Sequence, residues 1–200
     1  MFTGSTGGLL MYCIKIDQKT FNKMNKNERV LDAIVGSVMY KTVTKNSDMD
    51  CVRVVKDNKD MKSGEVYLYN HFDTVDHIIV DESTFLKKAK DGSDLVLFEA
   101  YYSNSGEDFN LSKVVRAYTG VSHRDLLETQ KEGKTDEFAE KKLYHALRCH
   151  FIAKELLLTG HIDFKGCAQD AKDFTNDIEQ EVLDKFVNSI IRFRDVLKAK

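Results

Sequence analysis

The sequence predicts an α+β protein, with a small mixed sheet in a first domain and helices in a second domain. Residues 29–104 hold several short apolar runs of strand length, bounded by glycine and polar residues. Beyond residue 105 the apolar residues recur instead at helical spacing, three or four positions apart. A polar cluster at 103–108 separates the two patterns. We therefore expect the sheet domain at residues 1–104 and the helical domain at residues 105–200.

The composition is that of a globular chain with no strong field of either sign. Of the 200 residues, 42% are hydrophobic and 31% are charged, and the formal net charge is −2. This balance argues against long nucleic acid as the main ligand, because RNA or DNA would have to bind a local basic patch. No apolar run is long enough to span a bilayer, and the first ten residues lack the pattern of a signal peptide. We expect a cytoplasmic protein with no membrane partner.

Polar boundaries define the elements of the first half. Five apolar runs predict strands, and they lie at 11–16, 30–35, 52–55, 66–69 and 75–80. The charged stretch at 56–64 predicts a hairpin-like loop between the third and fourth of these strands. Asp81 is expected to cap a helix over 82–90 that Gly92 ends, and a second apolar helix is expected over 95–102.

The second half reads as helical throughout. Ser122 and Asp125 have the spacing of a capping box, which predicts that a helix begins just before residue 126. A long amphipathic helix is expected over 140–159, and Gly160 should end it. Asn176 is expected to begin the last helix.

Two aspartates alternate just before the predicted strand at 52–55, at Asp48 and Asp50. In an extended chain residues two apart point to the same side, so both carboxylates should project together. Such oxygens suit Mg²⁺, while Gly36 and Ser37, at the end of the preceding strand, would offer backbone N–H groups and a hydroxyl to a phosphate. The same residues also fit a polar turn that enters a strand, because Asn46 and its neighbours are typical turn residues.

The spacing of Gly36-Ser37, ten residues and then Asp48-x-Asp50 resembles the nucleotidyltransferases of the DNA polymerase β superfamily. The resemblance implies transfer of an NMP from an NTP, ATP by default, to a hydroxyl acceptor on RNA, protein or a small molecule, with release of pyrophosphate. It also implies a catalytic site of two Mg²⁺ ions held by Asp48, Asp50 and Asp76, the last of which lies on a later strand. Gly36 and Ser37 would then seat the phosphates.

Downstream segments resemble one branch of that superfamily, the uncharacterised nucleotidyltransferases of bacteria and phages. These segments lie at 85–88, 97–99, 144–148 and 156–160. The whole similarity touches roughly residues 29–165, and it implies the cytosol of a bacterium or of a phage-infected cell.

The chain departs from the family pattern near the predicted site. Lys41 and Arg53 stand where glycine is common, and Lys45 stands where proline is common. Val38 replaces a frequent arginine. A first alternative is therefore a catalytically degenerate nucleotide-binding or regulatory protein, such as a toxin-neutralising partner, since a fold does not fix a function.

Four residues of the helical half are further candidates. His145 and Arg148 lie three positions apart and so share one helix face. We interpret them either as nucleotide-binding residues that contact the triphosphate or the acceptor, or as part of a solvated polar face. Arg116 and His123 fit the loose spacing of the helical HEPN ribonucleases, and Gly120 predicts a helix break between them. A HEPN-like ribonuclease is the second alternative.

Overall fold

The computed structural model describes two compact units, Met1–Asn110 and Leu111–Lys200. The division lies at the start of the first helix beyond the polar cluster at 103–108, rather than inside that cluster. In the part of the chain that the structure describes, no helix is both long and apolar enough to cross a membrane. The described residues are 13–43, 49–57, 60–71, 75–104, 106–129, 131, 133, 135–177, 181–182, 185–186, 188–190 and 192.

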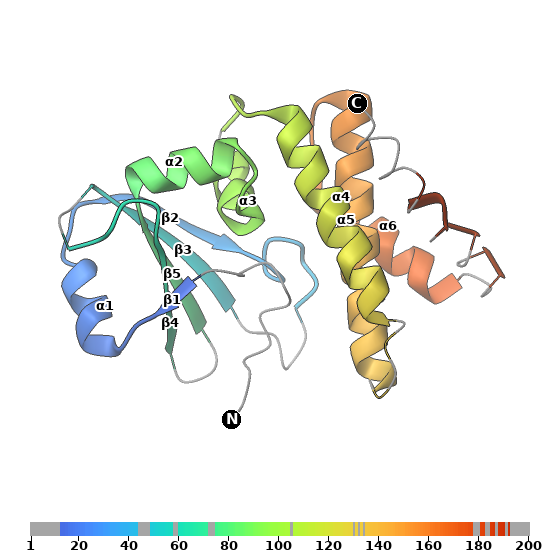
Figure 1. The fold of residues 1–200 in the computed structure, drawn as a ribbon, viewed down its shortest axis with the longest axis horizontal. Coiled ribbons are helices and arrows are strands. Elements are labelled where there is room, and N and C mark those ends of the chain that lie inside the picture. Colours follow the sequence, from blue (N-terminus) through green and yellow to red (C-terminus); the bar gives the residue numbers. More distant parts are fainter. Residues whose placement is uncertain are drawn as a thin grey trace. The chain divides into compact units, whose positions relative to one another are not determined.

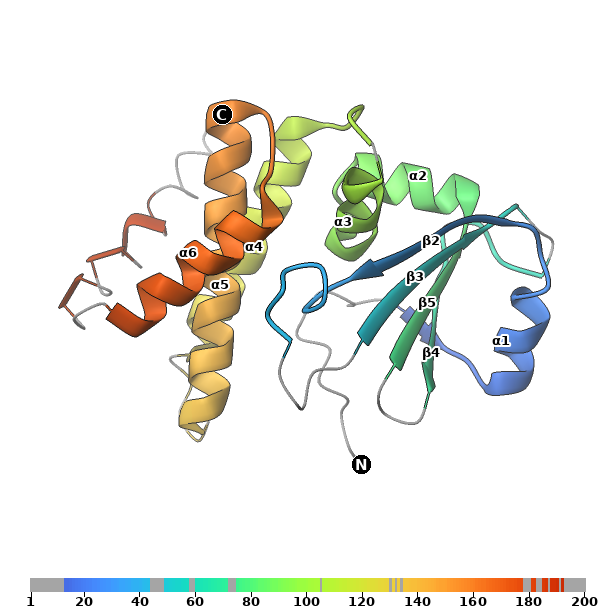
Figure 2. The same ribbon diagram turned by 180° about the vertical axis from the view of Figure 1, so that it is seen from behind.

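The first unit contains a mixed sheet, as the sequence predicts. Its strands within the described residues are β1 (Cys13–Lys15), β2 (Arg29–Val35), β3 (Met49–Val55), β4 (Val66–His71) and β5 (Val75–Asp81). Their order across the sheet is β1-β4-β5-β3-β2 (Figure 2). β3 runs parallel to β5 and β1 parallel to β4, whereas β2 and β3, and β4 and β5, are antiparallel.

The prediction of a hairpin-like loop over 56–64 is wrong. β3 and β4, which this segment connects, are not neighbours, because β5 lies between them. β5 is the most deeply buried strand, with Ile78, Ile79 and Val80 all shielded from solvent. A strand that is apolar on both faces gains most from a central position in the sheet, which separates β3 from β4.

Local capping explains the helices of the first unit, which are α1 (Gln18–Met24), α2 (Glu82–Lys90) and α3 (Leu95–Ser103) (Figure 1). The side chain of Asp81 accepts a hydrogen bond from the N–H of Thr84, so the predicted cap of α2 is confirmed. Asp94 caps α3 in the same way, by accepting from the N–H groups of Val96 and Leu97.

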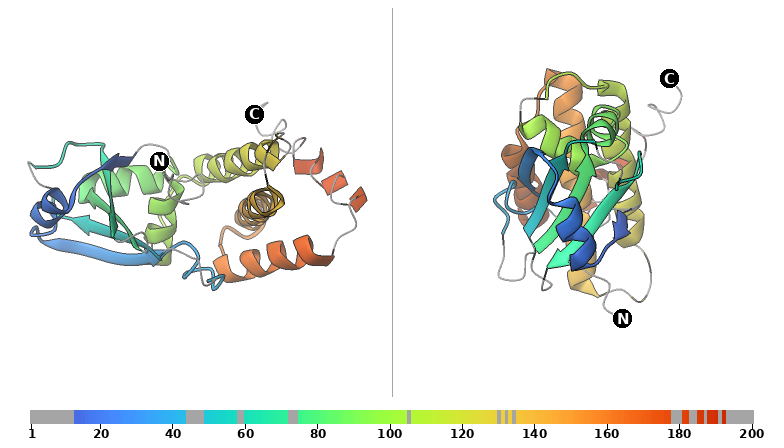
Figure 3. Two further views of the ribbon diagram at one scale, coloured as in Figure 1. Left: turned by 90° about the horizontal axis from the view of Figure 1, so that it is seen from below. Right: turned by 90° about the vertical axis from the view of Figure 1, so that its left-hand side faces the viewer.

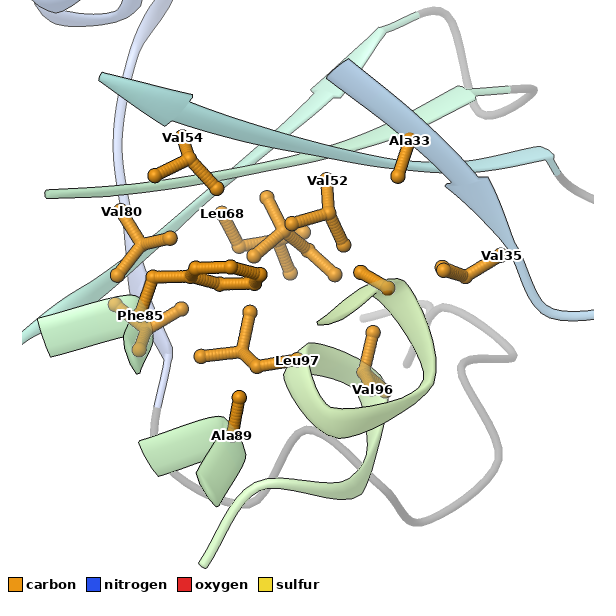
Figure 4. Packing of buried hydrophobic residues seen from close by; sticks show 13 residues of the cluster. Ala33, Val35, Val52, Val54, Leu68, Val80, Phe85, Ala89, Val96 and Leu97 are labelled. Atoms are coloured by element: carbon orange, nitrogen blue, oxygen red, sulfur yellow. The ribbon is translucent and has the colours of Figure 1, made fainter. Parts of the chain in front are cut away.

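One hydrophobic core lies between the sheet and the helices α2 and α3. Figure 4 shows Val52 and Val54 of β3 on the side of the sheet that faces Phe85 and Leu97. Side chains alternate along a strand, so Val55 points to the opposite face, where a smaller cluster packs against α1. The even-numbered positions of β3 and β5 therefore face α2 and α3. Residues 50 and 76 belong to this set.

The second unit is helical, with α4 (Leu111–Thr129), α5 (Asp136–Thr159) and α6 (Phe164–Asp177) in its described part. α5 packs against both α4 and α6 (Figure 3). Its core includes Leu126, Ala146, Leu147, Ala171 and Ile190. Gly160, in a left-handed conformation with φ of 75°, ends α5 as expected.

Three expectations for this unit are wrong. Ser122 and Asp125 do not cap a helix, because both lie buried in the middle of α4. Gly120 does not break that helix either, since the buried side chains on either side of it stabilise the helix by more than the roughly 1 kcal/mol that a helical glycine costs. Asn176 lies in the last turn of α6 rather than at the start of a helix.

Candidate functional site

A row of polar side chains crosses the sheet near one end of its strands. Asp50, the second residue of β3, stands directly opposite Asp76, the second residue of β5. Asp76 in turn stands opposite Asn70 near the end of β4, and Asp50 stands opposite Val35 at the end of β2. Directly opposed residues project from the same face of a sheet, so the two carboxylates and the amide share a face. It is the face that carries Val52 and the main core.

The two carboxylates are close enough to serve one ligand. Neighbouring strands lie about 4.8 Å apart, which places in-register side chains within reach of a single cation. Asp76 is buried, with 4% of its surface exposed, while Asp50 is partly exposed. The amide Nδ2 of Asn70 donates a hydrogen bond of 2.6 Å to Oδ1 of Asp76, which fixes the orientation of that carboxylate. Asn70 carries no signal in the sequence and was not predicted.

The turn after β2 brings backbone against this pair. Gly36 has a φ of 66°, and a Cβ at this position would overlap Oδ2 of Asp50. The turn closes on itself through hydrogen bonds from the N–H of Tyr40 to the carbonyl of Gly36 (3.1 Å) and from the N–H of Thr42 to the carbonyl of Ser37 (2.9 Å). The donors of Tyr40 and Thr42 are therefore used inside the turn and are not presented to a ligand.

A buried side-chain pair anchors the same turn. The hydroxyl of Tyr40 donates to a carboxylate oxygen of Glu99 on α3, and both residues are almost completely buried. This contact joins the turn to a residue of α3 that lies 59 positions later in the sequence. Neither residue was predicted, because no local pattern marks a tyrosine and a glutamate that meet only in the folded chain.

The metal ligands expected from the sequence are only partly described. Asp48 lies outside the described residues. Among the residues that the structure does describe, no group of three or more His, Cys, Asp or Glu side chains is placed to hold a metal ion. Asp50 and Asp76 form a pair of hard oxygen donors, which fits Mg²⁺, since this ion commonly takes one or two carboxylates and completes its shell with water and phosphate.

The second unit contains a separate polar centre around Asp125 of α4. This carboxylate is completely buried, and it accepts hydrogen bonds from Nδ1 of His145, from Nε of Arg124 (3.0 Å) and from Nζ of Lys142 (3.3 Å). Burial on its own would raise the pKa of Asp125, but the hydrogen bond from His145 and the charges of Lys142 and Arg124 outweigh burial and lower the pKa to about 2. Asp125 is therefore ionised at neutral pH.

The protonation state of His145 is also set by its surroundings in this centre. Burial and the charge of Arg148 lower the pKa of His145 to about 4, against the opposing effect of Asp125. The ring is thus neutral at pH 7, and because Asp125 accepts a hydrogen bond at Nδ1, that nitrogen carries the proton. His145 and Arg148 share a face of α5 as predicted, but they do not form a solvated face, since the His145 side chain is only 12% exposed and Arg148 only 7%.

The residues behind the ribonuclease alternative lie on one helix. Arg116 is exposed and His123 is partly buried, and both belong to α4, which continues through Gly120. Residues seven apart are two helical turns apart, so the two side chains lie on the same side of α4.

No family model matches the chain, and no match was found among the curated proteins or the solved structures. The class that the described residues define is an α+β protein, in which a mixed sheet carries an in-register carboxylate pair beside a glycine turn. What this site does is therefore inferred from its chemistry and from the sequence resemblance.

Proposed function

We propose that the protein is a nucleotidyltransferase that moves an NMP from an NTP, ATP by default, to a hydroxyl acceptor and releases pyrophosphate. The observation that carries the proposal is the in-register pair of Asp50 and Asp76 beside the backbone of Gly36. Two ionised carboxylates on one face of a sheet repel each other, and a cation bound between them relieves that repulsion. Glycine also permits close approach of the backbone to a ligand, which is the role that a phosphate-seating turn requires.

In this proposal Asp50 and Asp76, together with Asp48, hold two Mg²⁺ ions, and Gly36 and Ser37 seat the phosphates of the triphosphate. Bound Mg²⁺ would neutralise charge on the phosphate oxygens and lower the pKa of the attacking hydroxyl. The protein's own contribution is to fix these groups in place. Asn70 would hold the Asp76 carboxylate in one orientation through the hydrogen bond to Oδ1.

Two departures from the family pattern are compatible with this proposal. Arg53 stands where glycine is common, but its guanidinium binds Asp32 at 2.5 Å on the face of the sheet opposite to Asp50. Lys41, also in a common glycine position, has a φ of 57°, the left-handed conformation that glycine adopts most readily. The backbone thus keeps the shape that a glycine would give, which supports the resemblance.

The direct test is isothermal titration of ATP with Mg²⁺ into the wild type, an Asp50→Asn variant, an Asp76→Asn variant and the double variant Asp48→Asn/Asp50→Asn. Each substitution keeps the shape of the side chain and removes its charge. Asp32→Asn is the matched control, since Asp32 is an exposed aspartate of the same sheet on the opposite face. We expect the Asp48, Asp50 and Asp76 variants to lose binding and the control to keep it.

Pyrophosphate release with candidate acceptors then separates catalysis from binding. Release that depends on Asp50 and Asp76 supports transfer. Binding of Mg–ATP without release under any acceptor supports the degenerate nucleotide-binding alternative. Equal Mg–ATP binding by the wild type and all of the Asp variants rejects the proposed site.

A further inference from the structure

The turn after β2, residues 36–42, is fixed at two places by other parts of the first unit. At its start, the backbone of Gly36 lies against the carboxylate of Asp50. Near its end, the hydroxyl of Tyr40 donates to a carboxylate oxygen of Glu99 on α3. The turn that would seat the phosphates therefore depends on α3 as well as on the sheet.

Glu99 is an unusual residue for its place in the fold. Residues 95–100 of α3 are all buried, and Glu99 is the one ionisable residue among them. Only 1% of Glu99 is exposed. A carboxyl group is costly to bury, and an apolar side chain would pack at this position at a lower cost. Places where a sequence departs from what packing favours are often functional, so the contact of Glu99 with Tyr40 points to a role beyond packing.

A second residue of α3 contacts the same turn. Ser103 lies four residues after Glu99, and its hydroxyl donates to Sδ of Met39 at 3.2 Å. Residues four apart share a helix face, so one face of α3 meets the two consecutive residues Met39 and Tyr40. Ser103 is exposed and a thioether sulfur is a weak acceptor, so the contact between Tyr40 and Glu99 is the stronger of the two.

Tyr40 is also a residue at which the turn closes on itself. Its N–H donates to the carbonyl of Gly36 at 3.1 Å, and the N–H of Thr42 donates to the carbonyl of Ser37 at 2.9 Å. The side chain of Tyr40 is closely packed, since only 2% of the residue is exposed. Holding the hydroxyl of Tyr40 in place therefore also holds the backbone of Gly36 and Ser37, the two residues that would seat the phosphates.

We propose that Glu99, acting through Tyr40, is a positioning residue for the triphosphate. Glu99 does not touch the ligand; its hydrogen bond keeps residues 36–42 in the shape that seats the phosphates beside Asp50 and Asp76. A turn that already has its bound shape loses less conformational entropy on binding, so the contact raises the affinity for the triphosphate. This role rests on the proposed transferase function and extends its site from the sheet to α3.

Isothermal titration of Mg–ATP into the full chain tests this role, with Tyr40→Phe and Glu99→Leu as the variants that remove the hydrogen bond. Tyr40→Phe keeps the ring and loses only the hydroxyl. Each variant should weaken Mg–ATP binding about tenfold. The double variant should lose no more affinity than either single variant, because both changes remove the same contact. Additive losses would mean that Glu99 and Tyr40 act separately, which overturns the proposal.

Glu99→Gln is the conservative variant, because the amide oxygen of glutamine still accepts a hydrogen bond from the hydroxyl of Tyr40. It should bind Mg–ATP within about twofold of the wild type. A loss as large as that in Glu99→Leu would show that the charge of Glu99 matters rather than its hydrogen bond, and would also overturn the proposal.

Thr84→Val is the matched control for a purely structural loss. Thr84 is 2% exposed, and its hydroxyl donates to Oδ2 of Asp81 at 2.7 Å, at the end of β5 opposite to Asp76. The change removes a buried hydrogen bond from the same unit, so urea unfolding should show a loss of stability, as it should for Tyr40→Phe. Mg–ATP affinity should remain that of the wild type. An equal loss of affinity in Thr84→Val would assign the effect of Tyr40→Phe to general destabilisation and reject the role of Glu99.

Hydrogen exchange of the wild type tests the same role without any variant. If the contact with Glu99 fixes the turn in advance, the N–H of Thr42 is already protected in the free protein, and Mg–ATP slows its exchange little. Slowing by about tenfold or more would show that the ligand, rather than Glu99, orders the turn.

Titration of Mg²⁺ without nucleotide separates this role from the proposed function. Tyr40→Phe should bind Mg²⁺ as the wild type does, because Asp50 and Asp76 lie on neighbouring strands that the change does not touch. Loss of Mg²⁺ binding would mean that Tyr40 acts on the carboxylates rather than on the turn. A wild type that binds no Mg–ATP rejects the proposed function and this role with it, whereas equal Mg–ATP binding by the wild type and Tyr40→Phe rejects only the role of Glu99.

Discussion

The carboxylate of Asp50 on β3 lies against the backbone of Gly36, just after β2, and its Oδ2 occupies the space where any other residue at position 36 would place its Cβ. The glycine is required for a second reason, since its φ of 66° is a left-handed conformation that other residues adopt only with strain. One position thus serves both the shape of the turn and the placement of the carboxylate.

Replacing Gly36 by alanine should therefore destabilise the protein more than backbone strain alone would. The left-handed backbone costs an alanine about 1–2 kcal/mol, and the overlap with Asp50 must be relieved in addition by moving that carboxylate. Urea unfolding should show the loss of stability. Mg–ATP titration should show a loss of affinity, because Asp50 leaves its place beside Asp76.

Gly64→Ala is the matched control for this change. Gly64 also has a left-handed φ, of 87°, but a Cβ there would meet no atom of a described residue within 4 Å. Its variant should show the strain of about 1–2 kcal/mol without any change in ligand affinity. Equal destabilisation by both variants would mean that the contact between Gly36 and Asp50 has no energetic weight.

Replacing Lys41 by glycine should have the opposite effect on stability, because Lys41 is a non-glycine residue with a left-handed φ of 57°. Lys41→Gly should stabilise the protein by about 0.5–1 kcal/mol, since the relief of strain exceeds the extra entropy of glycine in the unfolded chain. Chemical denaturation measures this directly. Lys26→Gly, at an exposed turn position without positive φ, should be neutral or destabilising, and stabilisation by both variants would refute the explanation.

The buried histidines predict how stability depends on pH. Burial lowers the pKa of His145 and that of His150 to about 4, from an ordinary value of 6.5. Between pH 6.5 and 4 the unfolded chain therefore binds protons that the folded chain does not. The contribution of these two histidines to the free energy of unfolding should be complete above pH 6.5. It should be lost as the pH drops through this window. Asp125, with its pKa near 2, adds a further loss only below about pH 4.

His145→Gln should flatten that profile by up to about 3 kcal/mol between pH 7 and 4, because one of the two titrating groups is removed. Denaturant unfolding at a series of pH values measures the slope. His161→Gln, which changes an exposed histidine of the same unit, should leave the slope as in the wild type. A profile of unchanged slope in His145→Gln would show that His145 is not held neutral by the fold.

Local features of the fold could be predicted from the sequence because their causes are local. Asp81 lies immediately before α2 and caps it within three residues, and Gly160 ends α5 by its own conformation. The apolar run at 75–80 placed Asp76 on a strand. Each of these depends on a few neighbouring residues, so the sequence contains the whole signal.

Pairings between distant residues could not be predicted in the same way. That Asp50 and Asp76 share a site was expected from the family resemblance alone, since no local pattern shows that β5 lies between β3 and β4 and brings the two residues into register. Asp125 shows the same limit in another form. With Ser122 it has the spacing of a capping box, which predicts a helix start. Instead, α5 packs against α4 and brings His145 to Asp125, so Asp125 is stabilised in the middle of a helix.

Asn70 offers a test of the carboxylate row that does not require a nucleotide. Asn70→Asp replaces the donor to Asp76 by a third carboxylate, so a hydrogen bond is lost and like charges are brought together. Without metal the variant should be destabilised by about 1–3 kcal/mol. Added Mg²⁺ should raise its melting temperature more than that of the wild type, since a cation then binds three carboxylates. Asn22→Asp, the same change at an exposed position of α1, should show no response to Mg²⁺, and an equal response in both variants would show that the row of Asp50 and Asp76 is not a cation site.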